Sequence, residues 1–205
     1  MQTEIVPAGE PGAAERAARV LQNGGLVAFP TDTVYGVGAP VFAADSVMRL
    51  YEVKGRSSEK AIAVLVAKAA DLERVAAGLT PSARKLAQRF WPGPLTLVVP
   101  KHPALPEAVS ALPTVGIRQP DHPVAQRLLT LAGPLAVTSA NLSGQPSPVS
   151  AQQVMAQLGG RIDVLLDGGQ TPGGVASTVV DCTAERPVIV RAGPISLAEI
   201  EAALA

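Results

Sequence analysis

The sequence predicts an α/β fold in which a twisted, mixed β-sheet is flanked by helices. Short apolar runs rich in Val, Leu and Ile alternate along the chain with segments of helical periodicity. Several neighbouring strands are close enough in sequence to be antiparallel, which favours a mixed sheet over a purely parallel one. Because the 205 residues contain no internal repeat and no long linker, residues 1–205 are expected to form a single domain.

The expected elements follow one another in a regular order. Helix 13–22 ends at two glycines, and helix 81–90 opens with a proline at its first turn. Residues 101–113 are proline-rich and expected to be irregular, and strand 114–118 ends at an arginine. The other expected helices are 44–53, 69–77, 123–131, 152–158 and 197–204. The other expected strands are 26–29, 61–67, 95–99, 135–138, 163–166, 177–182 and 188–191.

The composition excludes several classes of function. Basic and acidic residues number 17 each, so no global charge drives binding to nucleic acid or membrane. The single cysteine, Cys182, excludes an intramolecular disulfide and a cysteine-based metal site. Residues 1–14 lack the pattern of a secretory signal, and no apolar run approaches the length of a membrane span. We therefore expect a soluble, cytoplasmic protein that makes no membrane contact.

Residues 30–38 are the stretch around which a site is predicted. The apolar strand 26–29 runs into Pro30, and Thr31, Asp32 and Thr33 follow where the chain leaves the sheet. Open α/β sheets bind their ligands at such strand ends. The stretch contains two glycines and is expected to be a loop. A second loop, 142–148, is expected to lie over the same site.

Other polar side chains also follow predicted strands. The hydroxyl and amide groups belong to Thr114, Thr138, Ser139, Asn141, Ser177 and Thr178. The cations that could join them are Lys54, Arg56, Lys60, Arg118 and Arg191. Lys54 and Arg56 are expected to project from the end of helix 44–53. Because Arg binds phosphate or carboxylate through paired hydrogen bonds and Lys acts as a point charge, we predict an anion site.

Other chemistries fit the residues less well. The sequence has no phosphate-binding Gly-Lys-Ser loop, no dinucleotide fingerprint and no Gly-x-Ser-x-Gly elbow. His102 and His122 flank prolines and have no cysteine or carboxylate cluster beside them, so no metal site is predicted. Cys182 lies in an apolar strand and is expected to be a core residue.

Six motifs are arranged along the chain in a recognisable order. They are Pro30-Thr31-Asp32-Thr33-Val34-Tyr35-Gly36, Lys54-Gly55-Arg56, Phe90-Trp91-Pro92-Gly93-Pro94-Leu95-Thr96-Leu97, Gly116-Ile117-Arg118-Gln119-Pro120-Asp121-His122-Pro123, Ser139-Ala140-Asn141-Leu142-Ser143-Gly144 and Ser177-Thr178-Val179-Val180-Asp181. Together they resemble the YrdC-domain family, the threonylcarbamoyl-AMP synthases of tRNA modification. The resemblance runs from about Ala13 to Arg191 and implies a YrdC-like fold.

The resemblance also implies a reaction. L-Threonine, bicarbonate and ATP would give threonylcarbamoyl-AMP and pyrophosphate, with Mg²⁺ carried on the ATP phosphates. The product would pass to a separate tRNA threonylcarbamoyl transferase complex, and weak direct binding of tRNA is left open. Lys54 and Arg56 suit this chemistry because cations can offset the repulsion between a carbamate and ATP.

Roles for individual residues follow from the same resemblance. The catalytic residues would be Lys54, Arg56, Ser139 and Asn141. L-Threonine would contact Thr31, Thr33, Arg118, Thr138 and Ser177. ATP would contact Arg56, Lys60, Thr114, Ser139, Ser147 and Arg191.

The chain departs from the family pattern at two positions. Many members have Asn-Pro-Leu where this chain has Lys60-Ala61-Ile62, so Lys60 could replace the amide as a phosphate contact. Many also carry a histidine where Leu65 stands, so no polar contact to threonine is expected there. The chain ends soon after Arg191-Ala192-Gly193, which resembles the short, single-domain members.

Two other functions stay open on the residues alone. One is a non-catalytic RNA-binding module on the same fold. The balanced net charge argues against strong nonspecific RNA affinity, although a local basic patch would escape that argument. The other is a sugar-phosphate lyase of the same architecture, which would want an acidic metal cluster that the sequence does not show. The synthase is favoured over both.

Overall fold

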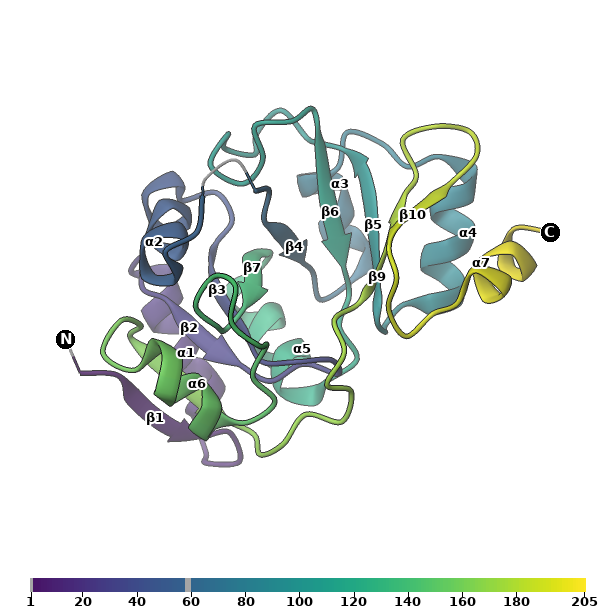
Figure 1. Ribbon diagram of the computed structural model, residues 1–205. Helices are drawn as coiled ribbons and strands as arrows, with labels where there is room; N and C mark the ends of the chain where they lie inside the picture. The colour runs from purple at the N-terminus through teal and green to yellow at the C-terminus, as the bar shows by residue number, and fades with distance from the viewer. Residues whose placement is uncertain (1, 58–59) are drawn as a thin grey trace.

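The computed structural model describes residues 2–57 and 60–205, and its centre is a ten-stranded mixed sheet (Figure 1). The order of the strands is β1-β8-β2-β3-β7-β4-β6-β5-β9-β10. They are β1 (Glu4–Pro7), β2 (Val27–Phe29), β3 (Gly36–Pro40), β4 (Ala63–Leu65), β5 (Leu95–Pro100), β6 (Thr114–Arg118), β7 (Leu135–Ser139), β8 (Val164–Asp167), β9 (Thr178–Asp181) and β10 (Val188–Arg191). β8 pairs in parallel with β1 and β2, as does β4 with β6 and β5 with β9, and the other pairs are antiparallel. The prediction of a mixed sheet is confirmed.

Helices cover both faces of this sheet. They are α1 (Ala13–Gln22), α2 (Ala44–Lys54), α3 (Leu72–Val75), α4 (Pro81–Phe90), α5 (Pro123–Ala132), α6 (Ala151–Leu158) and α7 (Leu197–Leu204), with a 3₁₀ turn η1 (Ala69–Asp71) before α3. Three of these helices begin at capping residues. Side-chain oxygens of Thr80, Ser150 and Ser196 accept hydrogen bonds from backbone N–H groups in the first turns of α4, α6 and α7. The helix predicted over 69–77 is instead η1 followed by the single turn α3.

Alternation along the strands creates two apolar cores. Val27 and Phe29 of β2 point to a smaller core with α1 and α5, whereas Ala28 between them points to a larger core. The larger core takes buried residues from α2, α3, α4, α6 and α7. In Figure 1, α1 and α5 lie together behind the sheet, and β1 and β10 mark its opposite ends.

Two strands were not predicted, and the stretch 30–38 is only partly a loop. Gly36 and Gly38 lie in β3, which pairs with β2 and β7. A Cβ atom at Gly36 would lie 2.7 Å from Cγ1 of Val137 on β7, so this strand needs a glycine where its neighbour's side chain crosses it. β1 was missed because it is short and depends on parallel pairing with β8, which lies far away in the sequence.

The chain after β10 packs directly on the backbone before β9. A Cβ atom at Gly193 would lie 2.3 Å from the amide nitrogen of Thr178 and 2.6 Å from the carbonyl carbon of Ser177. Backbone atoms cannot rotate away from such a contact as a long side chain can. Gly193 therefore fixes where Ser177 enters the sheet.

We expect Gly193→Ala to lower the free energy of unfolding by about 1–3 kcal/mol, the usual penalty for overpacking. Gly78→Ala is the matched control, because a Cβ atom at Gly78 has no heavy atom within 4 Å. Urea unfolding of both variants measures the difference. Equal free energies of unfolding for the two variants would show that the backbone at Gly193 can shift to accommodate the methyl group without destabilising the protein.

Candidate active site

A cavity of about 370 Å³ opens on the face of the sheet formed by β7, β4, β6, β5 and β9. The strand register explains its position, because Ser139 is paired with Gly36, and Arg118 with Leu65, on one face. The predicted site residues in its lining are Thr31, Thr33, Arg56, Arg118, Thr138, Ser139, Ser147, Ser177 and Arg191. Such a volume lies in the ordinary range for small-molecule sites.

Arg118 is the most buried of the three arginines that line the cavity, at 6% exposed. Its Nε donates to the carbonyl of Gly93 at 2.9 Å, Nη1 to the Thr33 hydroxyl at 2.9 Å and Nη2 to Oδ1 of Asp32 at 2.5 Å. Burial lowers the pKa of Arg118, and the Asp32 carboxylate opposes that shift. The guanidinium is therefore held rigidly at the cavity wall, and one N–H on each Nη is left over from these three bonds.

Asp32 is the carboxylate that pairs with Arg118. Asp121 contributes only its backbone N–H, which donates to the same Asp32 Oδ1 at 3.0 Å. The second oxygen, Oδ2, is buried and has no hydrogen-bond partner among the described residues. Asp32 was grouped with its polar neighbours from the sequence but was not assigned to the site, because a charge beside a turn gives no sign of its distant partner.

The hydroxyl groups of Thr31 and Thr33 form a chain with a defined direction. Thr31 donates to the carbonyl of Val34 at 2.7 Å, so its single proton is used. The bond of 2.9 Å between the two hydroxyls must then be donated by Thr33, which also accepts from Arg118. Thr33 is left with a lone pair and no proton for a ligand in the cavity.

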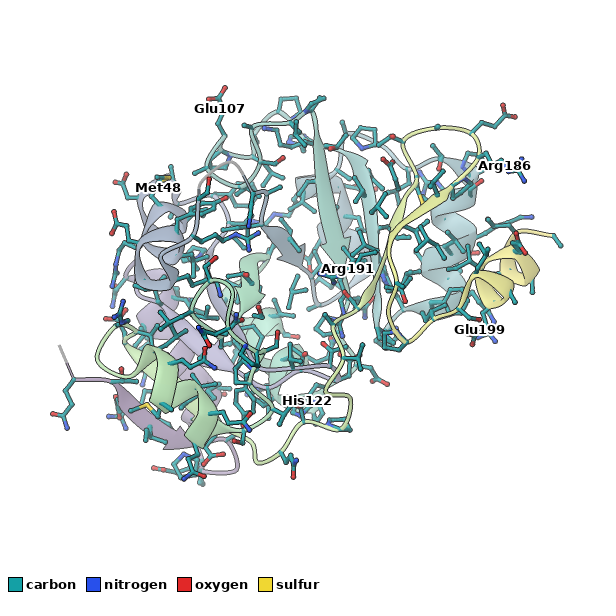
Figure 2. The ribbon with its side chains drawn as sticks, viewed as in Figure 1. Met48, Glu107, His122, Arg186, Arg191 and Glu199 are labelled. Atoms are coloured by element: carbon teal, nitrogen blue, oxygen red, sulfur yellow. The ribbon has the colours of Figure 1, made fainter. Side chains whose placement is uncertain are left out.

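Arg191 and Ser177 form a second polar group in the cavity lining. Arg191 donates to the carbonyl of Ser177 through Nε at 3.1 Å and Nη2 at 2.8 Å, and Nη2 also lies 3.0 Å from the Ser177 hydroxyl. Burial and the nearby Arg118 both lower the pKa of Arg191. Figure 2 shows Arg191 near the centre of the molecule, far from Arg186 and Glu199 at its edge.

Thr96 is a lining residue that the sequence analysis missed. It lies on β5, and its hydroxyl is 2.8 Å from that of Ser177. The available signal was the alternation of strand 95–99, which places Thr96 and Val98 on the face opposite Leu95 and Leu97. The remaining lining residues are mostly apolar: Val34, Gly36, Ala61, Ile62, Ala63, Leu65, Val98, Gly116, Val137, Ala176 and Val179.

Lys54 was expected to project from the end of its helix, but its side chain is buried and is not part of the cavity lining, so its catalytic role stays a prediction. Lys54 is 2% exposed, and its ammonium donates to the carbonyls of Ser139, at 2.5 Å, and Asn141. Gly55 follows in the left-handed conformation, so α2 ends there and the Lys54 side chain turns inward. Burial, and secondarily the charge of Arg56, lower the pKa of Lys54 to about 8. Lys54 thus clamps the turn that presents the Ser139 side chain.

Asn141 belongs to the same turn and also lies outside the lining. Its amide nitrogen donates to the carbonyls of Leu142 and Gln145, each at 2.8 Å, and so shapes the start of loop 142–148. Its Oδ1 is buried without a partner among the described residues. The loop returns to the sheet where Pro148 accepts from the Tyr35 N–H at 2.9 Å, and its Ser147 lines the cavity.

The other cations and Thr114 lie at the margin of the site. Arg56 lines the cavity and donates to the carbonyl of Ala61 at 3.1 Å, and burial lowers its pKa. Lys60 is exposed and is not part of the lining. Thr114 lies on the same strand face as Gly116 and Arg118, but at the far end of β6 and outside the lining. Lys60 and Thr114 as ATP contacts stay predictions.

Residues 2–57 and 60–205 show neither a metal-binding cluster nor a membrane-spanning helix. No group of three or more His, Cys, Asp or Glu side chains there could hold a metal ion. No helix there is long and apolar enough to cross a bilayer. Cys182 is buried, and burial raises the pKa of its thiol to about 12, as expected of a core residue.

The chain is similar in sequence to known proteins. The family model Sua5/YciO/YrdC, described as telomere recombination, matches residues 19–193. The chain is 45% identical over 187 residues to a threonylcarbamoyl-AMP synthase of Pyrococcus abyssi, covering 90% of this chain and 55% of that protein. It is 44% identical over 205 residues to the Bacillus subtilis threonylcarbamoyl-AMP synthase, covering 98% and 59%. The chain thus spans little more than half the length of these two relatives.

Solved structures resemble this one closely. The P. abyssi Sua5 structure complexed with L-threonine superposes with a TM-score of 0.95 at 42% identity, covering 100% of this chain and 61% of that one. The E. coli YciO structure matches with a TM-score of 0.85 at 23% identity, covering 97% and 98%, which supports the fold alone.

We expect Asp32→Ala to destabilise the protein by about 3–5 kcal/mol, because it leaves the buried Arg118 guanidinium without its counter-charge. Asp32→Leu combined with Arg118→Met removes both charges and should recover much of that loss. Glu15→Ala, which breaks an exposed pair with Arg127, is the control and should leave the unfolding midpoint nearly unchanged. If Asp32→Ala unfolded at the same urea concentration as Glu15→Ala, the buried pair would not stabilise the fold.

The pKa of Lys54 predicts a pH-dependent difference in stability. Because its folded value of about 8 lies below the ordinary 10.5, the folded chain binds fewer protons than the unfolded chain between those values. The free energy of unfolding should therefore rise with pH, by about 3 kcal/mol across that window, relative to Lys54→Met. Urea unfolding at several pH values measures it, with exposed Lys68→Met as control. A flat difference would mean that Lys54 keeps its ordinary pKa.

Proposed function

The chain belongs to the Sua5/YciO/YrdC family, and from that membership and the cavity we propose that it is an L-threonylcarbamoyladenylate synthase. This nucleotidyltransferase would convert L-threonine, bicarbonate and ATP to threonylcarbamoyl-AMP and pyrophosphate. The observation that carries the proposal is the convergence of Arg118, Arg191 and Arg56 on one cavity with hydroxyl groups between them. Such a site suits two anionic substrates that must be brought together.

The proposed reaction consists of two steps. The threonine ammonium loses a proton, and the amine attacks the carbon of bicarbonate to give a carbamate and water. A carbamate oxygen then attacks the α-phosphorus of ATP, and the bond to pyrophosphate breaks. Neither step needs a protein nucleophile, so positioning and charge stabilisation would supply the rate.

The threonine end of the site is proposed to lie at Arg118. Its remaining N–H groups suit the amino-acid carboxylate, because a guanidinium binds a carboxylate through paired hydrogen bonds. The lone pair left on Thr33 suits a donor of the substrate, either the amine or the side-chain hydroxyl. Thr31 would then act by orienting Thr33, and Ser177 would complete the carboxylate contact. Thr138 also lines this region.

The nucleotide end is proposed to extend toward Arg56, Ser139, Ser147 and Arg191. Arg56 and Arg191 have no carboxylate within 4 Å among the described residues, so their charge is available to phosphate. Lys54 and Asn141 would contribute to the nucleotide end indirectly, by fixing the turn on which Ser139 lies. Mg²⁺ is proposed to enter as part of the substrate, on the ATP phosphates.

The proposed product defines what must follow in the cell. A carbamoyl-adenylate is an activated acyl group, so a transferase complex that acts on tRNA would consume it. We place the protein in the cytoplasm, where ATP, bicarbonate and tRNA are available, and we leave weak tRNA binding to direct measurement.

Mass detection of threonylcarbamoyl-AMP after incubation with ATP, bicarbonate and L-threonine tests the proposal. Product should appear only when all three substrates are present, and pyrophosphate should form in equal amount. A salt titration of tRNA binding separates the alternative of a non-catalytic RNA-binding module. Tight tRNA binding without any threonylcarbamoyl-AMP would overturn the synthase assignment.

Arg56→Ala should lower turnover by about a hundredfold, the usual effect of losing one stabiliser of transition-state charge. Its thermal unfolding should change little, because Arg56 is only partly buried and donates chiefly to carbonyls of its own loop. Arg127→Ala is the control, since its side chain is 60% exposed and remote from the cavity lining. Near-normal turnover in Arg56→Ala would place the reacting phosphate elsewhere.

A further inference from the structure

Thr96 and Ser177 share a buried hydrogen bond at the wall of the cavity. Their hydroxyl oxygens are 2.8 Å apart, and each residue is 5% exposed. Thr96 lies on β5, one residue before Leu97, which pairs with Ile117 of β6, so Thr96 stands beside Arg118. On its other side, β5 pairs with β9, which begins immediately after Ser177. The pair thus lies between Arg118 and Arg191.

The other neighbours of each hydroxyl bear on the direction of this bond. Ser177 Oγ already accepts from Nη2 of Arg191, which can only donate. Thr96 has its methyl turned toward β6, since Cγ2 would lie 3.1 Å from a Cβ atom at Gly116. Its hydroxyl therefore faces β9, where Ser177 Oγ is its hydrogen-bond partner. The 2.8 Å distance fits either direction, and donation by Thr96 is the arrangement that fills both lone pairs of Ser177 Oγ.

We infer that Thr96 is a positioning residue that directs the hydroxyl proton of Ser177 into the cavity. Thr96 and Arg191 together occupy both lone pairs of Ser177 Oγ, so its own proton is left for a ligand. A hydroxyl that accepts two hydrogen bonds, one from a cation, is a stronger donor than a free hydroxyl. The group that it addresses is an anionic oxygen next to Arg118. Naming that oxygen as the carboxylate of L-threonine rests on the proposed function.

Two substitutions at Thr96 separate the hydroxyl from the methyl. Thr96→Val keeps the branched shape against Gly116 and removes the donor, whereas Thr96→Ser keeps the donor and removes the methyl. Thr96→Val should raise KM for L-threonine about fivefold to tenfold, since the Ser177 proton is then free to turn away from the ligand. Its kcat and its KM for ATP should stay within about twofold. Thr96→Ser should retain the wild-type KM for L-threonine.

A double-mutant cycle tests whether Thr96 acts through Ser177. In a Ser177→Ala background, Thr96→Val should change KM for L-threonine by less than about twofold, because the hydroxyl that it orients is absent. A full, additive loss in that background would overturn the inference. So would equal losses in Thr96→Val and Thr96→Ser, or a parallel loss of ATP affinity and melting temperature, since these indicate a packing role.

Neutron diffraction from deuterated crystals decides the inference without any activity. A deuteron on Thr96 Oγ1 aimed at Ser177, with the Ser177 deuteron aimed into the cavity, would support it. A deuteron on Ser177 Oγ aimed at Thr96 would overturn it. If the wild-type protein makes no threonylcarbamoyl-AMP, the proposed function fails, and this measurement still decides the direction of the bond.

Discussion

The buried guanidinium of Arg118 connects three separate segments of this protein. It donates to Asp32 and Thr33 after β2, to Gly93 before β5, and it extends from the end of β6. Each contact is charge-assisted and almost free of water, so the segments cannot move independently without exposing an unpaired charge. The cavity exists because these segments are held apart at fixed positions around its wall.

The charges around the cavity are balanced at one end only. Asp32 neutralises Arg118, whereas Lys54, Arg56 and Arg191 have no carboxylate within 4 Å among the described residues. Burial lowers the pKa of each of these three cations, which shows that each is held against a desolvation penalty. An anion in the cavity would relieve that penalty for Arg56 and Arg191, which line it, whereas the Lys54 ammonium already donates to two carbonyls. The charges therefore favour an anionic ligand near Arg56 and Arg191 and a less charged ligand beside the Arg118–Asp32 pair, a division that fits the proposed substrates ATP and L-threonine.

Much of this arrangement could be predicted from local sequence. Helix starts at Pro81 and Pro123 and the strand ending at Arg118 have local causes, and the structure has them where the sequence predicted. β1 could not be found because it depends on pairing with the distant strand β8. The strand character of Gly36 was missed because a glycine-rich stretch is typical of a loop, and its fit beside Val137 of distant β7 cannot be seen in the sequence. The sequence correctly placed Lys54 at the end of α2, but its side chain points into the protein and not outward as expected. A helix position does not say whether a cation meets water or the carbonyls of another turn, here 85 and 87 residues away.

The sequence cannot predict whether a hydroxyl group in the site acts as a hydrogen-bond donor or as an acceptor. Thr33 and Ser177 are both polar residues at strand ends, and the sequence treats them alike. Because Thr31 donates to the carbonyl of Val34, we assign Thr33 as the donor to Thr31, so Thr33 faces the cavity as an acceptor. Ser177 receives from Arg191 and, on our inference, from Thr96, so it faces the cavity as a donor. An amino acid carries both kinds of group on one carbon, a donor amine and an acceptor carboxylate. If the proposed substrate L-threonine binds here, two hydroxyls of opposite polarity in the lining can select its orientation where two equivalent hydroxyls could not.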